Sequence, residues 1–417
     1  MTSILEDKTV PEKKILLNHV NEIDPGDIGS YEAVGGFKAL LKARGMSPEK
    51  VIEAVKASGL RGRGGAGFPC GAKWEMAGNA AGDEKYLICN ADEGEVGTFK
   101  DRYLLMHNPF SLLEGMAITG YAIGARKGYI YLRAEYRYLL EGLMNAISQC
   151  REKGYLDDLD VEIREGAGAY ICGEESALMN SIEGKRGESR FRPPFPTESG
   201  LFAKPTVINN VETLVNVPHI IENGADWYQG LGTEQSKGTK IFCVSGDVEK
   251  PGVYEMELGC NLQELMDLSG AKNIKWMQVG GSTGGIIPFE NLETPLSYET
   301  VLGSGAVMVF DRTRDVVDFA YRTMEFLNEE SCGKCTPCRE GTEVMVEILG
   351  RLVNGEGVLE DMDVLEELSE TMKLSALCGL GQSAPIPVLD TLKYFRTDYE
   401  NRISQSVLLR SLKAING

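Results

Sequence analysis

Residues 62–67 read Gly-Arg-Gly-Gly-Ala-Gly and fit the G-x-G-x-x-G fingerprint of dinucleotide-binding loops. In a standard Rossmann fold this loop leaves a strand and opens a helix. Here residues 47–60, which precede the loop, have helical spacing and a stop signal at Gly59. The residues that follow it contain Pro69 and Gly71, which disfavour a regular element. We therefore predict that the loop leaves a helix instead of opening one, which argues against the ordinary Rossmann interpretation.

The composition is that of a globular protein with two or three domains. The chain has 417 residues, of which 42% are hydrophobic and 25% are charged. Its formal net charge of -19 argues against nucleic acid as a partner. The first residues lack the apolar core of a signal peptide, and the longest apolar region, 115–132, is interrupted by two basic residues. We therefore expect a cytoplasmic chain without direct membrane insertion, and any membrane association would have to come through a partner.

The chain divides into three zones. The first alternates helical patterns with short apolar runs, which is typical of an α/β layer structure. The second contains two strand-like runs, a short helix over 261–270 and a further strand over 276–281. The third carries four helices with apolar stripes, enough for a bundle. We predict an α/β multidomain protein with an α/β domain over 1–235, a small β-grasp-like domain over 236–312 and a C-terminal four-helix bundle over 313–417.

Three cysteines at C-x-x-C-x-x-C spacing are the strongest chemical signal. Cys332, Cys335 and Cys338 lie on one tight loop between two predicted helices. This spacing supplies three ligands of a [4Fe-4S] cluster, which needs a fourth thiolate from elsewhere. We choose Cys378, because flanking glycines let backbone approach a cluster. A structural zinc site or a redox dithiol are the alternatives. The remaining six cysteines are scattered, and most of them are interpreted as small core residues.

Polar clusters follow several of the apolar runs. They are residues 90–95, residues 168–175, and the pair Asn209 and Asn210 with Thr213 nearby. Carboxylates and amides at strand ends are where an α/β sheet presents its ligand site. Turn capping by Asn and Asp, with solvated glutamates, is the alternative interpretation of each cluster taken singly.

Six motifs together carry a family resemblance. They are GRGGAGFPCGAKW, NADEGEVGTFKDR, GAGAYICGEESAL, RPPFPTESGL, KPTVINNVETL and SCGKCTPCREGT. This set closely resembles the NADH-binding flavoprotein subunit of respiratory complex I, the F or 51-kDa subunit of NADH:quinone oxidoreductase. The resemblance covers about residues 25–400. The same module occurs in diaphorase subunits of NAD-linked hydrogenases and formate dehydrogenases, so the module and its parent complex are separate questions.

The resemblance implies a modified Rossmann-like domain that holds FMN and NADH together. It places Glu95, which we take as the catalytic residue, near the reacting rings. It places Phe68 and Phe195 on the adenine. Glu175 would accept from the adenosine ribose hydroxyl and repel a 2′-phosphate, which favours NADH over NADPH. The other implied cofactor-binding residues are Gly62, Arg63, Gly64, Gly65, Gly67 and Lys73 around the glycine loop, with Asn90, Asp92, Glu93, Tyr170, Gly173, Glu174, Ile208, Asn209, Asn210 and Thr213.

The implied reaction is hydride transfer from NADH to FMN, followed by single-electron transfer to the [4Fe-4S] cluster and on towards quinone. We expect a thioredoxin-like [2Fe-2S] subunit and a larger Fe–S subunit as partners, with the β-grasp-like domain as the docking surface. A diaphorase of an NAD-linked hydrogenase or formate dehydrogenase is the nearest alternative, and the absence of fused ferredoxin-like extensions favours complex I. A non-enzymatic Fe–S scaffold and a zinc-stabilised regulatory protein are alternatives of other classes.

Two positions depart from the family pattern. The family usually has Thr where this chain has Cys70, and Pro where it has Val96. The first change removes a hydroxyl donor and places an oxidisable thiol near the site, and the second loosens a restrained backbone position. Neither removes a proposed cofactor ligand.

Overall fold

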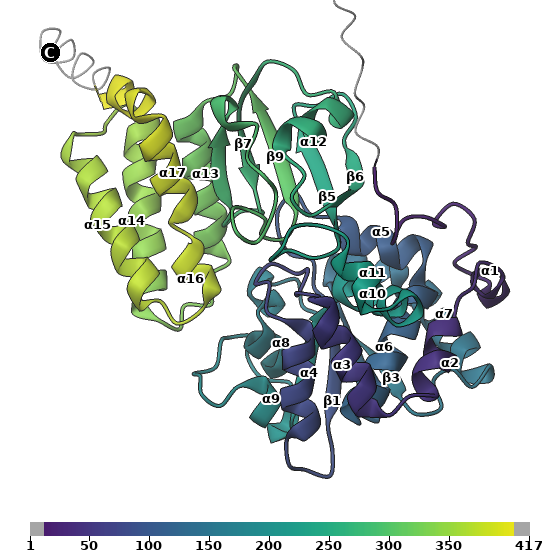
Figure 1. The fold of residues 1–417 in the computed structure, drawn as a ribbon. Helices are drawn as coiled ribbons and strands as arrows, with labels where there is room; N and C mark the ends of the chain where they lie inside the picture. Colours follow the sequence, from purple (N-terminus) through teal and green to yellow (C-terminus); the bar gives the residue numbers. More distant parts are fainter. Residues whose placement is uncertain (1–11, 404–417) are drawn as a thin grey trace, which may run out of the picture.

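The computed structural model describes residues 12–403, so the expectations for residues 1–11 and 404–417 lie outside the described part. Figure 1 shows three regions: a purple-to-teal α/β region, a green region built on a second sheet, and a yellow helical region beside it. The expected α/β multidomain class with a helical C-terminal part is confirmed. Among the described helices, none combines the length and the apolar character that crossing a membrane requires.

A four-stranded parallel sheet organises the first region. Its order is β3-β2-β1-β4, the strands being β1 (Tyr86–Ala91), β2 (Lys127–Leu132), β3 (Asp160–Glu165) and β4 (Thr206–Asn210). Alternate side chains of β1 enter two different cores. Leu87 and Cys89 pack on one face, whereas Tyr86 and Ile88 pack on the other. Both faces are therefore covered, as parallel sheets require.

Helices cover both faces of this sheet. The long helix α6 is buried along nearly its whole length, which explains its apolar sequence. Pairs of helices on the same face, such as α6 with α10, pack closely. The helices of this region are α1 (Ile28–Ala33), α2 (Lys38–Arg44), α3 (Pro48–Ser58), α4 (Cys70–Asn79), α5 (Lys100–His107), α6 (Pro109–Ile123), η1 (Ala134–Leu139), α7 (Leu140–Glu152), η2 (Tyr170–Gly173), α8 (Glu175–Ile182), α9 (Pro196–Ser199), η3 (Leu201–Ala203), α10 (Val211–Asn223) and α11 (Ala225–Gln229).

The glycine loop connects two helices. It leaves α3, as the sequence predicts, but it also opens α4 at Cys70, so the prediction that no helix follows was wrong. Pro69 sits at the N-cap, where its missing N–H costs nothing. Gly71 lets α4 approach α3, because a Cβ there would lie 2.4 Å from the Lys56 Cα. Pro69 and Gly71, which suggested a break in the sequence, are therefore both compatible with the start of α4.

A five-stranded mixed sheet forms the second region. Its order is β6-β5-β9-β7-β8, with α12 (Leu262–Ser269) and η4 (Phe289–Asn291) beside the strands β5 (Thr239–Gly246), β6 (Gly252–Glu257), β7 (Ile274–Val279), β8 (Gly285–Pro288) and β9 (Ala306–Asp311). The sequence predicts β5, β6, α12 and β7. It does not predict β8 and β9, although β9 pairs in parallel with β5 and completes the β-grasp-like arrangement.

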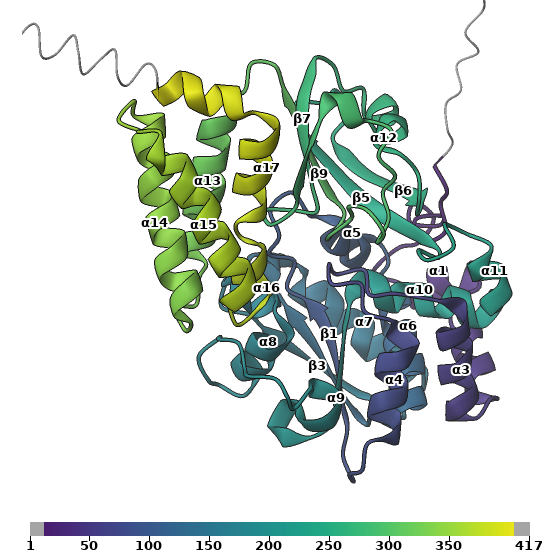
Figure 2. The same ribbon diagram turned by 60° about the vertical axis from the view of Figure 1, so that its left-hand side comes forward.

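The C-terminal region is the expected helical bundle. The sequence predicts four helices. The structure adds the short α16, which follows Cys378, and interrupts the last predicted helix at Phe395, after which residues 396–403 are helical again. Trp276 of β7 shares a core with the bundle and stacks on Phe310, with Phe319 and Phe395 at its edges. This contact joins the mixed sheet to the helices α13 (Val316–Glu329), α14 (Thr336–Val353), α15 (Glu360–Ser375), α16 (Gly379–Ser383) and α17 (Ile386–Tyr394). Figure 2 shows α16 at the end of the bundle that faces the parallel-sheet region.

Candidate functional site

A cavity of about 550 Å³ lies where the three regions meet. Ten of the sequence-predicted residues line it: Gly64, Gly65, Asn90, Asp92, Glu93, Glu95, Tyr170, Gly173, Glu174 and Asn210. The mixed-sheet and helical regions supply a second wall that the sequence reasoning missed. That wall contains Val279, Gly280, Thr283, Gly284, Gly285, residues 300–304, Gly379, Leu380 and Ser383.

The glycine loop forms one rim of the cavity. A Cβ on Gly64 would lie 2.9 Å from the Asn210 Cβ, so the backbone can touch the end of β4 only without a side chain. Gly65 has a φ of +128°, and a Cβ built on it would meet no atom within 4 Å. This stretch of the loop therefore presents bare backbone to the open cavity.

Several other predicted residues lie behind the cavity wall. The Thr213 hydroxyl accepts the Arg63 backbone N–H at 2.8 Å, and the side-chain Oδ1 of Asn209 accepts the Trp74 indole N–H at 2.9 Å. The Ile208 carbonyl accepts from Lys73 Nζ at 3.1 Å. These residues pack behind the wall and do not line the cavity. Gly62 and Gly67 do not line it either.

Glu95 is held between two regions. Its carboxylate accepts the Tyr170 hydroxyl at 2.7 Å and the Ser282 backbone N–H at 2.5 Å. Gly281 makes this approach possible, because a Cβ there would lie 2.0 Å from the Glu95 Cγ. Burial raises the pKa of Glu95, and the two hydrogen bonds partly offset that effect. The mixed-sheet region thus fixes the carboxylate predicted to act at the reacting rings.

Two further carboxyls in the cavity have raised pKa values. Burial raises the pKa of Asp92 to about 7, and its Oδ2 is buried without a hydrogen-bond partner. Burial, with the nearby Asp101 carboxylate, raises the pKa of Glu93 to about 7. The Glu93 carboxylate accepts the backbone N–H groups of Asp101 and Arg102, at the start of α5. Asp92, which lines the cavity, therefore carries a buried oxygen that has no hydrogen-bond partner among the described residues.

The residues predicted for the adenosine end of NADH lie outside the lining of the large cavity. Glu175 forms ion pairs with Lys73 at 3.4 Å and with Arg192 at 3.0 Å. The aromatic rings of Phe68 and Phe195 are 45% and 51% exposed, which is unusual for large apolar side chains. The Lys73 ammonium lies 5.8 Å from the Phe68 ring centroid.

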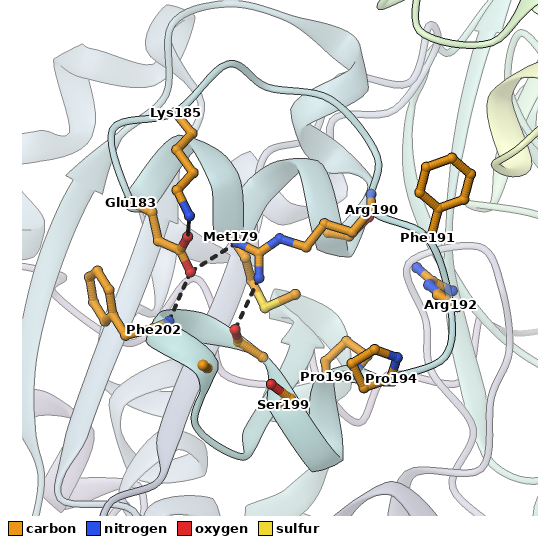
Figure 3. Close-up of a pocket in the computed structure, with 13 residues that line it drawn as sticks. Met179, Glu183, Lys185, Arg190, Phe191, Arg192, Pro194, Pro196, Ser199 and Phe202 are labelled. Atoms are coloured by element: carbon orange, nitrogen blue, oxygen red, sulfur yellow. Dashed lines mark hydrogen bonds and ion pairs between the residues drawn. The ribbon is translucent and has the colours of Figure 1, made fainter.

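A second cavity, of about 560 Å³, is lined in part by Arg192, the ion-pair partner of Glu175 (Figure 3). Figure 3 shows Glu183 between Lys185 and Arg190, with which it forms ion pairs. Arg192 lines this cavity and also pairs with Glu174, which lines the first one. The segment between α8 and α9 therefore lines the second cavity and contacts one residue of the first.

The four predicted cluster ligands come together. Cys332, Cys335, Cys338 and Cys378 line one small cavity between α14, α16 and η2. Gly381 permits this packing, since a Cβ there would lie 2.9 Å from the Cys338 Cβ. All ten cysteines are free. The described residues hold no group of three or more His, Cys, Asp or Glu side chains placed for a single metal ion.

The two sites share a wall. Ile171 of η2 and Leu380 of α16 each line both the large cavity and the cysteine cavity. Both side chains are buried and apolar. Leu380 lies two residues after Cys378, so a single short segment runs from a thiol to the large cavity.

The donor sets fit the two prosthetic groups that the sequence predicts. The large cavity offers bare glycine backbone on one rim and the unpartnered Asp92 oxygen, which suit a flavin nucleotide with several hydrogen-bond donors. The cysteine cavity offers four thiols and the Ser189 hydroxyl, which is buried without a partner. Four thiolates with a spare donor suit an iron–sulfur cluster.

The thiol of Cys70 does not fit the expectation of an oxidisable group. The residue is 1% exposed, and burial raises the pKa of its thiol to about 12. Because the thiolate is the reactive form, Cys70 is a packed core residue and not a redox-sensitive one.

Comparison with known proteins defines the class. Residues 55–219 match the Nuo51 FMN-binding domain, and residues 318–402 match the iron–sulfur binding region of NADH-ubiquinone oxidoreductase F. The chain is 45% identical to the second NADH-quinone oxidoreductase F subunit of Rhizobium meliloti, over 94% of this chain and 98% of the relative. It is also 45% identical to the NADP-reducing hydrogenase subunit HndC of Solidesulfovibrio fructosivorans, over 95% and 85%.

A solved structure agrees with this assignment. A crystal structure of an NAD+-reducing [NiFe]-hydrogenase in the H2-reduced state superposes with a TM-score of 0.87 and 42% identity. The match covers 94% of this chain and 67% of the hydrogenase chain.

These matches place the chain among flavin- and iron–sulfur-dependent NADH dehydrogenase subunits. More narrowly, it belongs to the F-subunit family of NADH-quinone oxidoreductases, which includes related hydrogenase subunits. FMN, a [4Fe-4S] cluster and NADH are the cofactors of this family, so those predictions are confirmed. The scaffold and zinc-protein alternatives are thereby excluded.

The raised pKa of Asp92 predicts a pH-dependent effect of Asp92→Asn on the flavin-free protein. Because the pKa of Asp92 is higher in the folded than in the unfolded state, protonated Asp92 favours the folded state. This contribution to stability is complete below about pH 4 and is lost as the pH rises through about 7. Relative to wild type, Asp92→Asn should gain stability between pH 5 and pH 8, by at most about 3 kcal/mol. Urea unfolding at both pH values measures this difference. An identical difference at both values would mean that Asp92 titrates normally.

Proposed function

We propose that this chain is the NADH dehydrogenase module of respiratory complex I, which passes electrons from NADH towards quinone. The observation that carries the proposal is the wall of Ile171 and Leu380 shared by the flavin-sized cavity and the four-cysteine cavity. A carrier that accepts electron pairs and one that accepts single electrons must lie this close for one chain to connect them. Several relatives named as F subunits of NADH-quinone oxidoreductase, at 41–45% identity, support the assignment.

Within this proposal, the residues position groups and do little acid–base chemistry. When bound, FMN accepts hydride from the nicotinamide and delivers electrons singly to the cluster. Glu95 lies at the cavity and is anchored by Tyr170 and Ser282, so it can hold the reactive end of the dinucleotide in register. Cys332, Cys335, Cys338 and Cys378 would hold the cluster. The exposed rings of Phe68 and Phe195 would stack on the adenine.

We further propose how the chain is placed in its complex. A thioredoxin-like [2Fe-2S] subunit and a larger Fe–S subunit would receive the electrons, a role that fits relatives named as single subunits of larger enzymes. Attachment to the cytoplasmic side of the inner membrane would run through these partners. Ten free cysteines support a reducing compartment.

A second candidate is the diaphorase subunit of an NAD-linked hydrogenase or formate dehydrogenase. It is favoured by the 44% identity to the NAD-reducing hydrogenase HoxS subunit alpha of Cupriavidus necator, over 86% of this chain and 61% of the relative. The complex that co-purifies with the tagged full-length chain distinguishes the two. Quinone reduction by NADH supports complex I, whereas hydrogen- or formate-linked NAD+ reduction supports the diaphorase.

An anaerobic NADH titration tests the shared chemistry of both candidates. We expect the flavin absorbance at about 450 nm to decrease and the cluster absorbance to decrease in part, because both groups receive electrons. Protein without bound FMN or iron, or without any response to NADH, would contradict the proposed function.

Substitution of the fourth cysteine tests the ligand set. Cys378→Ser should lose the cluster absorbance and most of the bound iron, because three thiolates cannot complete the set. NADH should still bleach the flavin in this variant. Cys260→Ser is the matched control, since Cys260 lies in the mixed-sheet region away from the cysteine cavity. A cluster that survives Cys378→Ser intact would remove this residue from the ligand set.

Substitution of Glu175 tests nucleotide preference. Glu175→Gln should raise the ratio of NADPH to NADH in kcat/KM by about tenfold or more, because Lys73 loses its carboxylate partner, Arg192 keeps only Glu174, and the 2′-phosphate is no longer repelled by Glu175. The ferricyanide-linked assay measures the ratio, with the exposed Glu141→Gln as control. The relative named as an NADP-reducing hydrogenase subunit makes this measurement informative. An unchanged ratio would exclude Glu175 from selecting the nucleotide.

A further inference from the structure

Beneath the glycine-loop rim of the large cavity lies a cluster of four charged side chains. Lys100 and Asp101 of α5, Glu212 of α10 and Lys240 of β5 are each at most 2% exposed. Lys100 Nζ lies 2.7 Å from Asp101 Oδ1 and 3.1 Å from Glu212 Oε2, and Lys240 Nζ lies 2.5 Å from the same Glu212 oxygen. Buried ion clusters contribute little stability compared with apolar packing of the same volume. We therefore expect this cluster to have a role other than stabilising the fold.

The cluster contacts Asn210, which lines the cavity at the end of β4. Lys100 Nζ donates to Asn210 Oδ1 at 3.3 Å, and Asn210 Nδ2 donates to Asp101 Oδ2 at 2.6 Å. Asn210 Oδ1 also accepts the Glu212 backbone N–H at 3.0 Å and so caps α10. A cation faces the amide oxygen and a carboxylate faces the amide nitrogen, so only one of the two amide orientations satisfies both.

In this arrangement one N–H of the Asn210 carboxamide has no acceptor within the cluster. A carboxamide has two N–H bonds, and Asp101 accepts one of those of Asn210. Lys100 has no free N–H, because its three donors meet Asp101, Asn210 and Glu212. Although Lys100 and Asp101 also border the cavity, the group that they leave available there is the second N–H of Asn210.

We propose that Lys100 and Asp101 are positioning residues that fix the Asn210 carboxamide, so that its free N–H donates to an acceptor oxygen of the flavin nucleotide. The inference rests on the FMN-dependent function proposed above. The two oxygens of Asp101 serve two different donors, one on Lys100 and one on Asn210. An asparagine at position 101 has one acceptor oxygen only, so it would turn an N–H2 group towards one of these donors and release the amide orientation.

The test measures FMN affinity of the flavin-free full-length chain by quenching of flavin fluorescence. Asp101→Asn should weaken FMN binding by about 10- to 100-fold, the effect of losing one well-aligned hydrogen bond to an anionic or carbonyl acceptor. Lys240→Met is the matched control, because Lys240 is equally buried and contacts Glu212 but not Asn210. It should bind FMN within about threefold of wild type. Circular dichroism and thermal unfolding check that each variant is folded.

Non-additivity separates positioning from a general structural effect. Asn210→Ser keeps an oxygen for the helix cap but removes the amide. In that background, Asp101→Asn should weaken FMN binding by less than about threefold, because the group that it positions is gone. Lys100→Gln gives a second route to the same comparison if Asp101→Asn does not fold.

Two results would overturn the inference: FMN affinity unchanged in Asp101→Asn, or effects of Asp101→Asn and Asn210→Ser that multiply. Failure of the wild-type chain to bind FMN would instead overturn the proposed function on which the inference rests.

Discussion

The buried guanidinium of Arg63 joins the glycine loop to the mixed-sheet region, and the shape of the large cavity depends on this junction. Its nitrogens donate to the Thr239 and Lys237 carbonyls and to the hydroxyls of Tyr228 and Tyr298. Arg63 is fully buried, so each of these bonds replaces one with water that folding removes. A planar fork with five donors can meet this set of acceptors, whereas the ammonium of lysine cannot. The Arg63 side chain therefore links the glycine loop to the mixed-sheet region through several hydrogen bonds.

Tyr298 strengthens the same junction from the other side. Its hydroxyl donates to the Gly62 carbonyl at 2.6 Å, and the Arg61 guanidinium lies 4.1 Å from its ring centroid. A Cβ on Gly67 would lie 2.5 Å from this ring, which explains a glycine at the end of the loop. Together with the bond from Ser282 to Glu95, these contacts make the mixed-sheet region a wall of the nucleotide site. That region thus has a role within the chain besides the docking role expected from family resemblance.

Local patterns in the sequence predict what local physics decides. The strands of the parallel sheet are visible as short apolar runs, and the spacing of Cys332, Cys335 and Cys338 is visible within seven residues. The start of α4 was missed because Pro69 and Gly71 act as breakers unless the neighbouring helix is known. The second wall of the cavity was missed because its contacts, such as Glu95 with Ser282, join residues nearly two hundred positions apart. No local signal distinguishes such glycine-rich turns from ordinary ones.

The charge of the cavity raises an apparent conflict that burial resolves. An acidic chain, with Asp92, Glu93 and Glu95 in one cavity, is predicted to bind an anionic nucleotide. If all three carboxyls were ionised, they would repel each other and the ligand. Burial raises the pKa of all three, to about 7 for Asp92 and Glu93. At neutral pH and below, part of this charge is therefore neutralised, and a protonated carboxyl can donate a hydrogen bond where a carboxylate can only accept one. The same burial that shapes the site thus lowers the electrostatic cost of filling it.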